Sequence, residues 1–428
     1  MTTASDSNGV PPGTAKPAPL GSASERIASL DFIRGIAVLG ILVPNIIAFG
    51  QPMTAYMYPG AFTTPHGAME DWMWVAQFVL FDGKMRGLFT LLFGAGVILF
   101  LERAEKRGAG PGLQMRRLLW LGLIGLLHHF LLWRGDILFT YAVAALLLLP
   151  FLALNPMRQL ILGFLGYCAG TLAYGAMFGW MARVADGEVA TASAMSQLQT
   201  EFLASKAGDL ADGKLETQLI ASGDYSGFVM HNLATHSLDP LIIVLFFAFE
   251  TIPLMLIGAA LYRLGLFGGA WPAARVRRWA WAGILGGTAL TIPIAVAALD
   301  DGLTYYGTLA AFSGWSMLPR LPVIIGLAAL LALWAPRANG WLGRRLTAAG
   351  RTAFSNYLGT SMLMVLVFHG WAGGLFGELT RGELYLVVLA AWAAMLAWPA
   401  WWLARFRYGP LEWLWRCLTY GRRFPLRR

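Results

Sequence analysis

The residues best suited to chemistry in this chain are two histidines and an aspartate on either side of a short turn. His128 and His129 end one apolar stretch, and Asp136 begins the next one after Arg134 and Gly135. An imidazole held beside a carboxylate can act as a general base with an orienting acid. The alternative for a buried His is a hydrogen bond between two helices. A metal site is not predicted here, because adjacent histidines point to different helix faces and no third ligand is evident.

A second candidate group stands at the start of the first apolar stretch. Asp31 and Arg34 are three residues apart, so they can lie on the same face of a helix. Asp31 is also well placed to cap that helix, and Arg34 would then be an ordinary cytoplasmic cation. The functional interpretation is contact with an anion at the cytoplasmic surface. Asn45 lies further along the same stretch, where a buried amide requires hydrogen-bond partners.

Three more charged residues stand in or beside apolar sequence. Lys84 and Arg86 are expected at the extracytoplasmic start of a span, which opposes the usual distribution of cations and favours a specific partner. Snorkelling of the two side chains toward the membrane surface is the alternative. Glu250 lies near the middle of another span. A charge at that depth costs roughly 2.5–3.5 kcal/mol on insertion scales, so Glu250 must be neutral, paired or directed into a cavity.

The elements that position these residues are predicted to be membrane-spanning helices. Hydrophobic residues make up 57% of the chain and charged residues 13%, against about 45–50% and about 25% in soluble domains. A bilayer core of about 30 Å requires about 20 apolar residues in a helix. The sequence therefore predicts an all-α polytopic membrane protein with about ten spans: 32–50, 84–102, 118–134, 137–154, 159–181, 239–262, 279–298, 320–336, 352–370 and 384–404. The short apolar stretch 70–82 is read as a half-helix or an interfacial segment.

The orientation of these spans follows from the lysines and arginines of the short loops. The connections 102–117, 263–278 and 337–351 are basic, whereas 51–71 and 299–318 contain neither Lys nor Arg. With ten spans, every basic connection falls on one side of the membrane. Because cations favour the cytoplasmic side, both termini are predicted to be cytoplasmic.

The remaining segments complete the predicted domain plan. Residues 1–25 are rich in Pro, Gly, Ser and Ala and are expected to form a disordered cytoplasmic tail. The transmembrane domain extends over 26–420, with an extracytoplasmic helical insertion at about 182–236, and 421–428 form a basic cytoplasmic tail. The net charge of +9 fits cytoplasmic loop bias and attraction to the lipid bilayer rather than nucleic-acid binding.

Several short motifs, taken in order, resemble the YeiB-like family of bacterial inner-membrane proteins, whose domain is of unknown function. They cover about residues 26–420 and are Leu30-Asp31-Phe32-Ile33-Arg34-Gly35, Asn45, Lys84, His128 with Gly135-Asp136, Gly350-Arg351 with Asn356-Tyr357, and Gly409-Pro410-Leu411-Glu412 with Arg416. The family is similar to transmembrane acyltransferases, which include the lysosomal heparan acetyltransferase. That resemblance implies acyl transfer from cytoplasmic acyl-CoA to an acceptor across the bilayer, assisted by a buried His.

On this interpretation the candidate residues acquire roles. His128 is the general base or transient acyl carrier, and Asp136 orients it. Acyl-CoA would be a co-substrate, with no permanently bound cofactor. Further residues would bind the substrates. Asp31, Arg34, Arg351, Glu412 and Arg416 would lie on the side of the acyl-CoA donor, with the arginines contacting the phosphates of the donor. Asn45 and Asn356 would donate hydrogen bonds in the cavity, Glu250 would lie at mid-span, and Lys84 and Arg86 would face an anionic cell-envelope acceptor.

Two other function classes remain open from the sequence. A membrane transporter or lipid-handling protein could use the same polar residues along a translocation path. A non-catalytic scaffold or accessory subunit is the third interpretation. A tunnel open on the cytoplasmic side would favour the enzyme, and a cavity around Glu250 and His128 would favour transport.

Overall fold

The chain forms a bundle of helices, and its structure here is a computed structural model that describes residues 28–187 and 193–428. Within these residues the one β pairing is an isolated bridge between Phe406 and Arg427. The predicted all-α fold is confirmed. The expected disordered tail, residues 1–25, lies outside the described residues.

The bundle is built from long apolar helices, which are long enough to span a bilayer core of about 30 Å. In the described part of the chain, seven segments are long and apolar enough to cross a membrane. Five are single helices: Ala28–Gly50 (α1), Pro156–Ala185 (α6), Asp239–Arg263 (α9), Ala273–Asp300 (α10) and Arg381–Arg405 (α15). The other two are Ala68–Glu105, which consists of α2 (Ala68–Leu80) and α3 (Lys84–Glu105), and Met317–Arg337, which consists of α12 (Met317–Trp334) and a 3-10 turn. The shorter apolar segments are Leu138–Ala153 (α5, Leu138–Leu148, with a 3-10 turn) and Ala353–Phe368 (α14). A multi-pass membrane protein is therefore confirmed, and the number of about ten spans stays a prediction.

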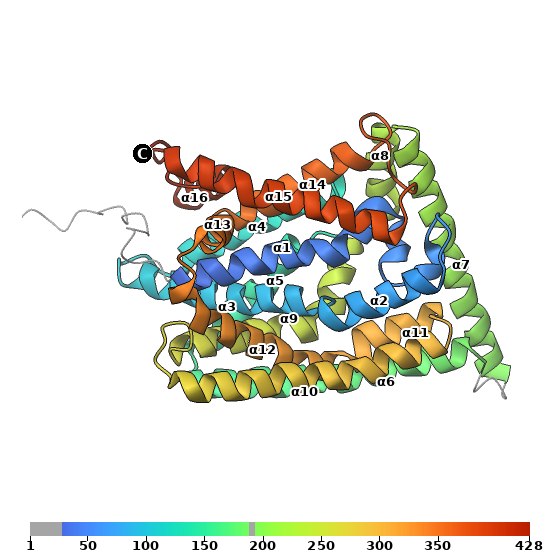
Figure 1. Cartoon of the computed structure of the whole chain (residues 1–428), viewed down its shortest axis with the longest axis horizontal. Helices are drawn as coiled ribbons and strands as arrows, with labels where there is room; N and C mark the ends of the chain where they lie inside the picture. Colours follow the sequence, from blue (N-terminus) through green and yellow to red (C-terminus); the bar gives the residue numbers. More distant parts are fainter. Residues whose placement is uncertain (1–27, 188–192) are drawn as a thin grey trace, which may run out of the picture.

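The remaining helices lie at the ends of the bundle or beside the long ones. They are Pro111–Leu131 (α4), Ser193–Ala221 (α7), Tyr225–Thr235 (α8), Tyr305–Ala310 (α11), Trp341–Arg351 (α13) and Pro410–Tyr420 (α16). Figure 1 shows α7 crossing one end of the bundle with α8 beside it, whereas α13 and α16 lie toward the opposite end, where α1 begins. The polar segment around 182–236 thus contains the helices α7 and α8. Its extracytoplasmic location stays a prediction.

Helix α1 is the central element of the bundle. Figure 1 shows it passing between the other long helices, and it packs against α3, α13, α14 and α15. Its sequence is apolar on all sides, which is typical of a helix buried among others. Ile33, Ile46 and Ile47 are fully buried. Because α1 carries Asp31, Arg34 and Asn45, its buried position fixes these side chains relative to several neighbouring helices.

The structure corrects the expected position of Lys84 and Arg86. A separate helix, α2, precedes α3, and the two together form one candidate span of 38 residues. Gly83 joins them with a left-handed backbone, φ +67°. Lys84 is 1% exposed, so it lies at a break inside the bundle and not at a membrane surface. The predicted span began at residue 84 and so placed Lys84 at its end, whereas the structure agrees with the alternative that residues 70–82 form a half-helix leading into that span.

The predicted orientation can be tested with reporter fusions. Fusions at residues 110 and 345 should report a cytoplasmic location and a fusion at residue 210 an extracytoplasmic one, because the basic connections and α7 lie at opposite ends of the bundle. Alkaline phosphatase and green fluorescent protein are suitable paired reporters. An extracytoplasmic signal at 110 or 345, or a cytoplasmic one at 210, would contradict the orientation.

Candidate functional site

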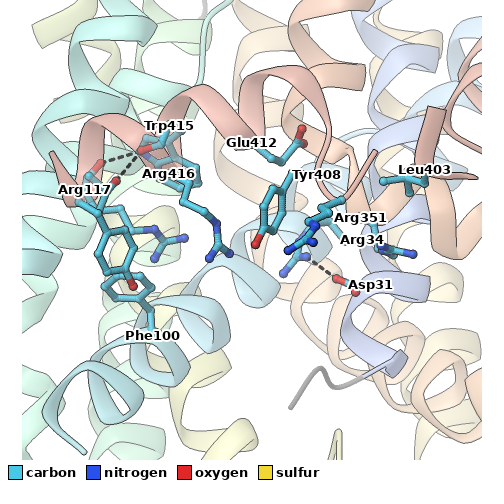
Figure 2. A pocket seen from close by; sticks show the side chains of 13 residues that line it. Asp31, Arg34, Phe100, Arg117, Arg351, Leu403, Tyr408, Glu412, Trp415 and Arg416 are labelled. Atoms are coloured by element: carbon cyan, nitrogen blue, oxygen red, sulfur yellow. Dashed lines mark hydrogen bonds and ion pairs between the residues drawn. The ribbon is translucent and has the colours of Figure 1, made fainter. Parts of the chain in front are cut away.

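A strongly basic cavity of about 240 Å³ lies between α1, α13 and α16 and the adjoining ends of α3 and α4. Its arginines come from opposite sides, Arg34 and Arg351 on one and Arg117 and Arg416 on the other (Figure 2). The residues that line it, called the basic cavity below, are Asp31, Arg34, Phe100, Arg117, Arg351, Leu403, Arg407, Tyr408, Glu412, Trp415, Arg416, Thr419 and Tyr420. Five arginines against two carboxylates suit a ligand that carries several negative charges, such as phosphates.

Aromatic rings hold two of these arginines without cancelling their charge. The guanidinium of Arg117 lies 4.5 Å from the ring of Phe100 and 4.3 Å from that of Trp415. The guanidinium of Arg416 lies 4.4 Å from the ring of Tyr408. A cation over an aromatic face is attracted by the ring but keeps its charge. These contacts therefore orient positive charge in the basic cavity and leave it able to attract an anion.

Two glycines bring the arginines of α1 and α13 together. A Cβ on Gly350 would lie 1.7 Å from the carbonyl oxygen of Asp31, and one on Gly35 would lie 2.0 Å from that of Leu346. The backbones of the two helices are thus in direct contact, as small residues allow between membrane helices. Arg34 and Arg351 each adjoin one of these glycines in the sequence. The close crossing of α1 and α13 is what places both arginines on one cavity.

This crossing gives a prediction about stability. We expect Gly350→Ala to destabilise the fold by about 1–3 kcal/mol, because the added methyl group cannot fit without separating α1 from α13. Thermal unfolding of the purified protein in detergent would measure the loss. The matched control is Gly359→Ala in α14, at an exposed position where a Cβ would have nothing within 4 Å. Equal unfolding temperatures for the two variants would show that the crossing tolerates a side chain.

Glu412 lines the basic cavity, but its carboxylate is bound to the start of α14. It accepts hydrogen bonds from the backbone N–H groups of Phe354, at 2.8 Å, and Ser355, at 3.1 Å, and from the Ser355 hydroxyl at 2.5 Å. Burial raises the pKa of this carboxyl above its ordinary value, and the bonds from Ser355 oppose that effect. The expectation that Glu412 binds substrate is therefore corrected. It caps α14 and so fixes α16 over the cavity.

A second, mostly apolar cavity of about 170 Å³ continues from the basic cavity into the bundle. The two share the side chains of Arg34, Arg117, Arg351, Glu412 and Trp415. The apolar residues that line this inner cavity include Val38, Ile41, Phe89, Leu92, Phe93, Leu121, Ile137 and Leu138. These two adjoining cavities, together called the passage below, thus place a cluster of cations next to apolar side chains of the long helices.

His128 and Asp136 form the direct contact that their spacing predicted. Nδ1 of His128 lies 2.8 Å from Oδ1 of Asp136, and both side chains are buried. The other carboxylate oxygen accepts from the backbone N–H of Phe139 at 2.9 Å and so caps the start of α5. Gly125 allows this approach, since a Cβ there would lie 2.4 Å from the Phe139 nitrogen. Sequence separation across the turn is only eight residues, which is why the contact could be predicted.

The contact fixes the state of the His128 ring. A carboxylate only accepts hydrogen bonds, so Nδ1 carries the proton in this contact. Nε2 is buried and makes no hydrogen bond with the described part of the chain. An imidazole oriented by a carboxylate at one nitrogen, with the opposite nitrogen unbonded, has the arrangement of a general base.

Tyr357 connects the inner cavity to this pair. Its ring lies 5.4 Å from that of His128, and its hydroxyl accepts from the backbone N–H of Ile137 at 3.3 Å. Both Tyr357 and Ile137 line the inner cavity. The inner end of the passage is therefore separated from His128 by the thickness of one side chain.

The two predicted asparagines differ in their surroundings. Asn45 lines a small cavity of about 20 Å³ that also borders Tyr357. Asn356 donates to the carbonyl oxygens of Ala349 and Met395 and accepts from the Trp398 indole. The expectation that Asn356 donates to a ligand is corrected, because its amide is already engaged in joining α14 to α15.

Lys84, Arg86 and Glu250 belong to a separate buried cluster and not to the passage. Arg86 contacts Glu250 at 2.7 Å, and Arg320 lies 3.5 Å from the other oxygen of that carboxylate. Lys84 donates to the carbonyl oxygen of Phe78 at 3.0 Å. The expectation that Lys84 and Arg86 meet an anionic acceptor is corrected, because charges inside a membrane bundle pair with one another.

Some residues of the site were not expected from the sequence. Arg117 and Arg407 line the basic cavity, although the only signal for Arg117 was its place in the basic connection 102–117, and Arg407 was not singled out. Arg320 begins the predicted span 320–336, and it pairs with Glu250. A cation at the cytoplasmic end of a span looks the same in sequence whether it faces lipid headgroups or a cavity.

Comparison with known proteins yields relatives without an assigned activity. Residues 261–422 match the family described as "Protein of unknown function (DUF418)". The chain is 31% identical to "Uncharacterized protein YeiB" of Escherichia coli, over 92% of this chain and 96% of that protein. It is 27% identical to "Uncharacterized protein YxaH" of Bacillus subtilis, over 93% and 95% of the two chains. No solved structure matches the chain significantly.

Proposed function

The chain belongs to the YeiB-like family of uncharacterised membrane proteins, and from that premise we propose that it transfers an acyl group from cytoplasmic acyl-CoA to a cell-envelope acceptor. The observation that carries the proposal is the passage from the basic cavity through the inner cavity to the neighbourhood of His128. The protein would lie in the inner membrane with the basic cavity on the cytoplasmic side, where acyl-CoA is found.

The donor fits the passage by its chemistry. Acyl-CoA carries its phosphates at one end and its thioester at the other, joined by a long flexible arm. The arginines of the basic cavity would hold the phosphates through charge-assisted hydrogen bonds. The arm and the acyl group would then extend into the inner cavity, whose apolar lining excludes water from the thioester.

The proposed reaction uses His128 as the general base. Its Nε2 takes the proton of an acceptor hydroxyl or amine while that group attacks the thioester carbonyl. The carbon–sulfur bond then breaks, and His128 returns the proton to the departing thiolate. Asp136 holds Nδ1 protonated and the ring in place. Proton transfer by a positioned side chain contributes about 10²–10⁴-fold to such reactions.

A transporter is the second candidate, favoured by the buried cluster of Arg86, Glu250 and Arg320. Charged groups at bilayer depth are a common feature of translocation paths. Glu250→Gln separates the two functions. The enzyme should keep its acyl transfer in this variant, because Glu250 does not line the passage. Loss of a cellular phenotype in Glu250→Gln but not in His128→Ala would favour transport.

Donor binding offers a direct test. Acetyl-CoA should raise the unfolding temperature of the purified protein, because a ligand that binds the folded state stabilises it by about 2.7 kcal/mol at a concentration 100 times its Kd. Inorganic phosphate at the same concentration controls for general anion effects. An unchanged unfolding temperature at millimolar acetyl-CoA would contradict the proposal.

A further inference from the structure

A cluster of two histidines and a carboxylate lies at the opposite end of the bundle from the basic cavity. Asp212 comes from α7, His231 from α8, and His236 from the residue that ends α8. Oδ1 of Asp212 lies 2.8 Å from Nε2 of His231 and 3.2 Å from Nε2 of His236. All three atoms lie within 4.8 Å of one another.

These separations are close to those of ligands on one metal ion. Bonds of about 2.0–2.1 Å at tetrahedral or octahedral angles place neighbouring ligand atoms about 3.0–3.4 Å apart. Two of the three separations, 2.8 and 3.2 Å, already lie near that range. Two imidazole nitrogens and one carboxylate oxygen form a donor set that prefers first-row transition cations over Mg²⁺ or Ca²⁺.

The neighbours of His236 hold its ring in the tautomer of a metal ligand. Its Nδ1 lies 2.9 Å from Oδ2 of Asp239, and its Nε2 lies 2.5 Å from Nη1 of Arg134. A carboxylate only accepts hydrogen bonds, so Nδ1 carries the proton, and Nε2, which lies 3.2 Å from Oδ1 of Asp212, is the nitrogen left to face a cation. A histidine ligand with its other nitrogen bound to a carboxylate is the usual arrangement in metal sites.

The charges of the cluster also favour a divalent cation. Asp212, Glu216 and Asp239 supply three carboxylates around Arg134. The side chains of His231 and His236 are each 13% exposed and that of Asp212 is 22% exposed, so an ion can enter from solvent. Arg134 approaches His236 from the cluster side, and cation binding requires it to move toward Glu216, which it already contacts at 3.0 Å.

We propose that Asp212, His231 and His236 bind one divalent transition cation, with Zn²⁺ as the probe. The site joins α7 to α8. Asp212 also pairs with Arg134, and Asp136 lies two residues after Arg134 on the same turn. The site therefore connects α7 and α8 to the turn that carries Asp136. The cation therefore braces the end of the bundle next to the His128–Asp136 pair, and this role does not depend on the proposed acyl transfer.

Metal content of the untagged, purified protein tests the proposal. After incubation with Zn²⁺ and dialysis, the unaltered protein should retain about one equivalent, and Zn²⁺ should raise its unfolding temperature. His231→Ala and His236→Ala should each lose the bound metal. Asp239→Asn should weaken binding by about 10–100-fold, as changes to the residues that orient ligands do.

The matched control is His66→Ala. His66 also has a carboxylate partner, Asp71 at 3.0 Å, but it belongs to no group of three metal-ligating side chains among the described residues. This variant should bind Zn²⁺ like the unaltered protein. Unfolding temperatures measured without metal show whether each variant is folded. Absence of bound Zn²⁺ in the unaltered protein, or equal binding by folded His231→Ala and His236→Ala, would overturn the proposal.

Discussion

His128→Ala should lower the rate of acyl transfer by about 10²–10⁴-fold while the protein still inserts and folds. The variant removes the imidazole whose Nδ1 contacts Asp136 and whose Nε2 has no hydrogen-bond partner among the described residues. Initial rates with labelled acetyl-CoA in membranes that contain equal amounts of each protein would measure the effect. Asp136→Asn should lower the rate as well, because an amide no longer fixes the tautomer of the ring.

His129→Ala is the control for this prediction. His129 is the neighbouring residue in α4 and is also buried, but it points about 100° away around the helix. Its variant reports what the loss of a buried imidazole does to folding without touching the His128–Asp136 pair. Equal activity of His128→Ala and the unaltered protein would exclude His128 as the base, and selective loss in His129→Ala would transfer the role to its neighbour.

Arg34→Ala and Arg416→Ala should weaken donor binding by about 1.5–3 kcal/mol each, which is roughly a 10–150-fold rise in Kd. Each variant removes a possible phosphate contact from the basic cavity. The KM for acyl-CoA should rise while kcat changes little, because these side chains lie away from the thioester. Binding should also weaken as salt rises.

Arg337→Ala is the matched control for the basic cavity. Arg337 is an exposed cation in one of the basic connections, and its guanidinium donates to the carbonyl oxygen of Leu333. Removing it changes the net charge by the same amount without altering the cavity. If Arg337→Ala weakens donor binding as much as Arg34→Ala, the cations act only through the general surface potential and the cavity does not hold the phosphates.

Local sequence relations predicted much of this molecule. The apolar stretches marked the helices within a few residues, as for α9, expected at 239–262 and found at Asp239–Arg263. The His128–Asp136 contact could be predicted because a tight turn brings together residues that are eight positions apart. Asp31 and Arg34 form their ion pair at 2.9 Å for the same reason, since both lie on one turn of a helix.

Contacts between distant segments could not be predicted in the same way. Glu412 reaches Ser355, a separation of 57 residues, and nothing in either local sequence indicates that pairing. His231 and His236 were not predicted as site residues, because their relation to Asp212 depends on how α7 folds back on α8. The break at Gly83 could not be predicted either, because its left-handed backbone packs against the side chain of Arg320, which comes from a different helix.

The most direct test of acyl transfer uses purified, unaltered protein with labelled acetyl-CoA and an extract of cell-envelope material. The proposed function predicts that acetyl-CoA binds, that label appears in an envelope acceptor, and that His128→Ala binds the donor without transferring the label. Failure to bind acyl-CoA at millimolar concentration, together with normal behaviour of His128→Ala in a cellular phenotype, would contradict it and favour a transporter.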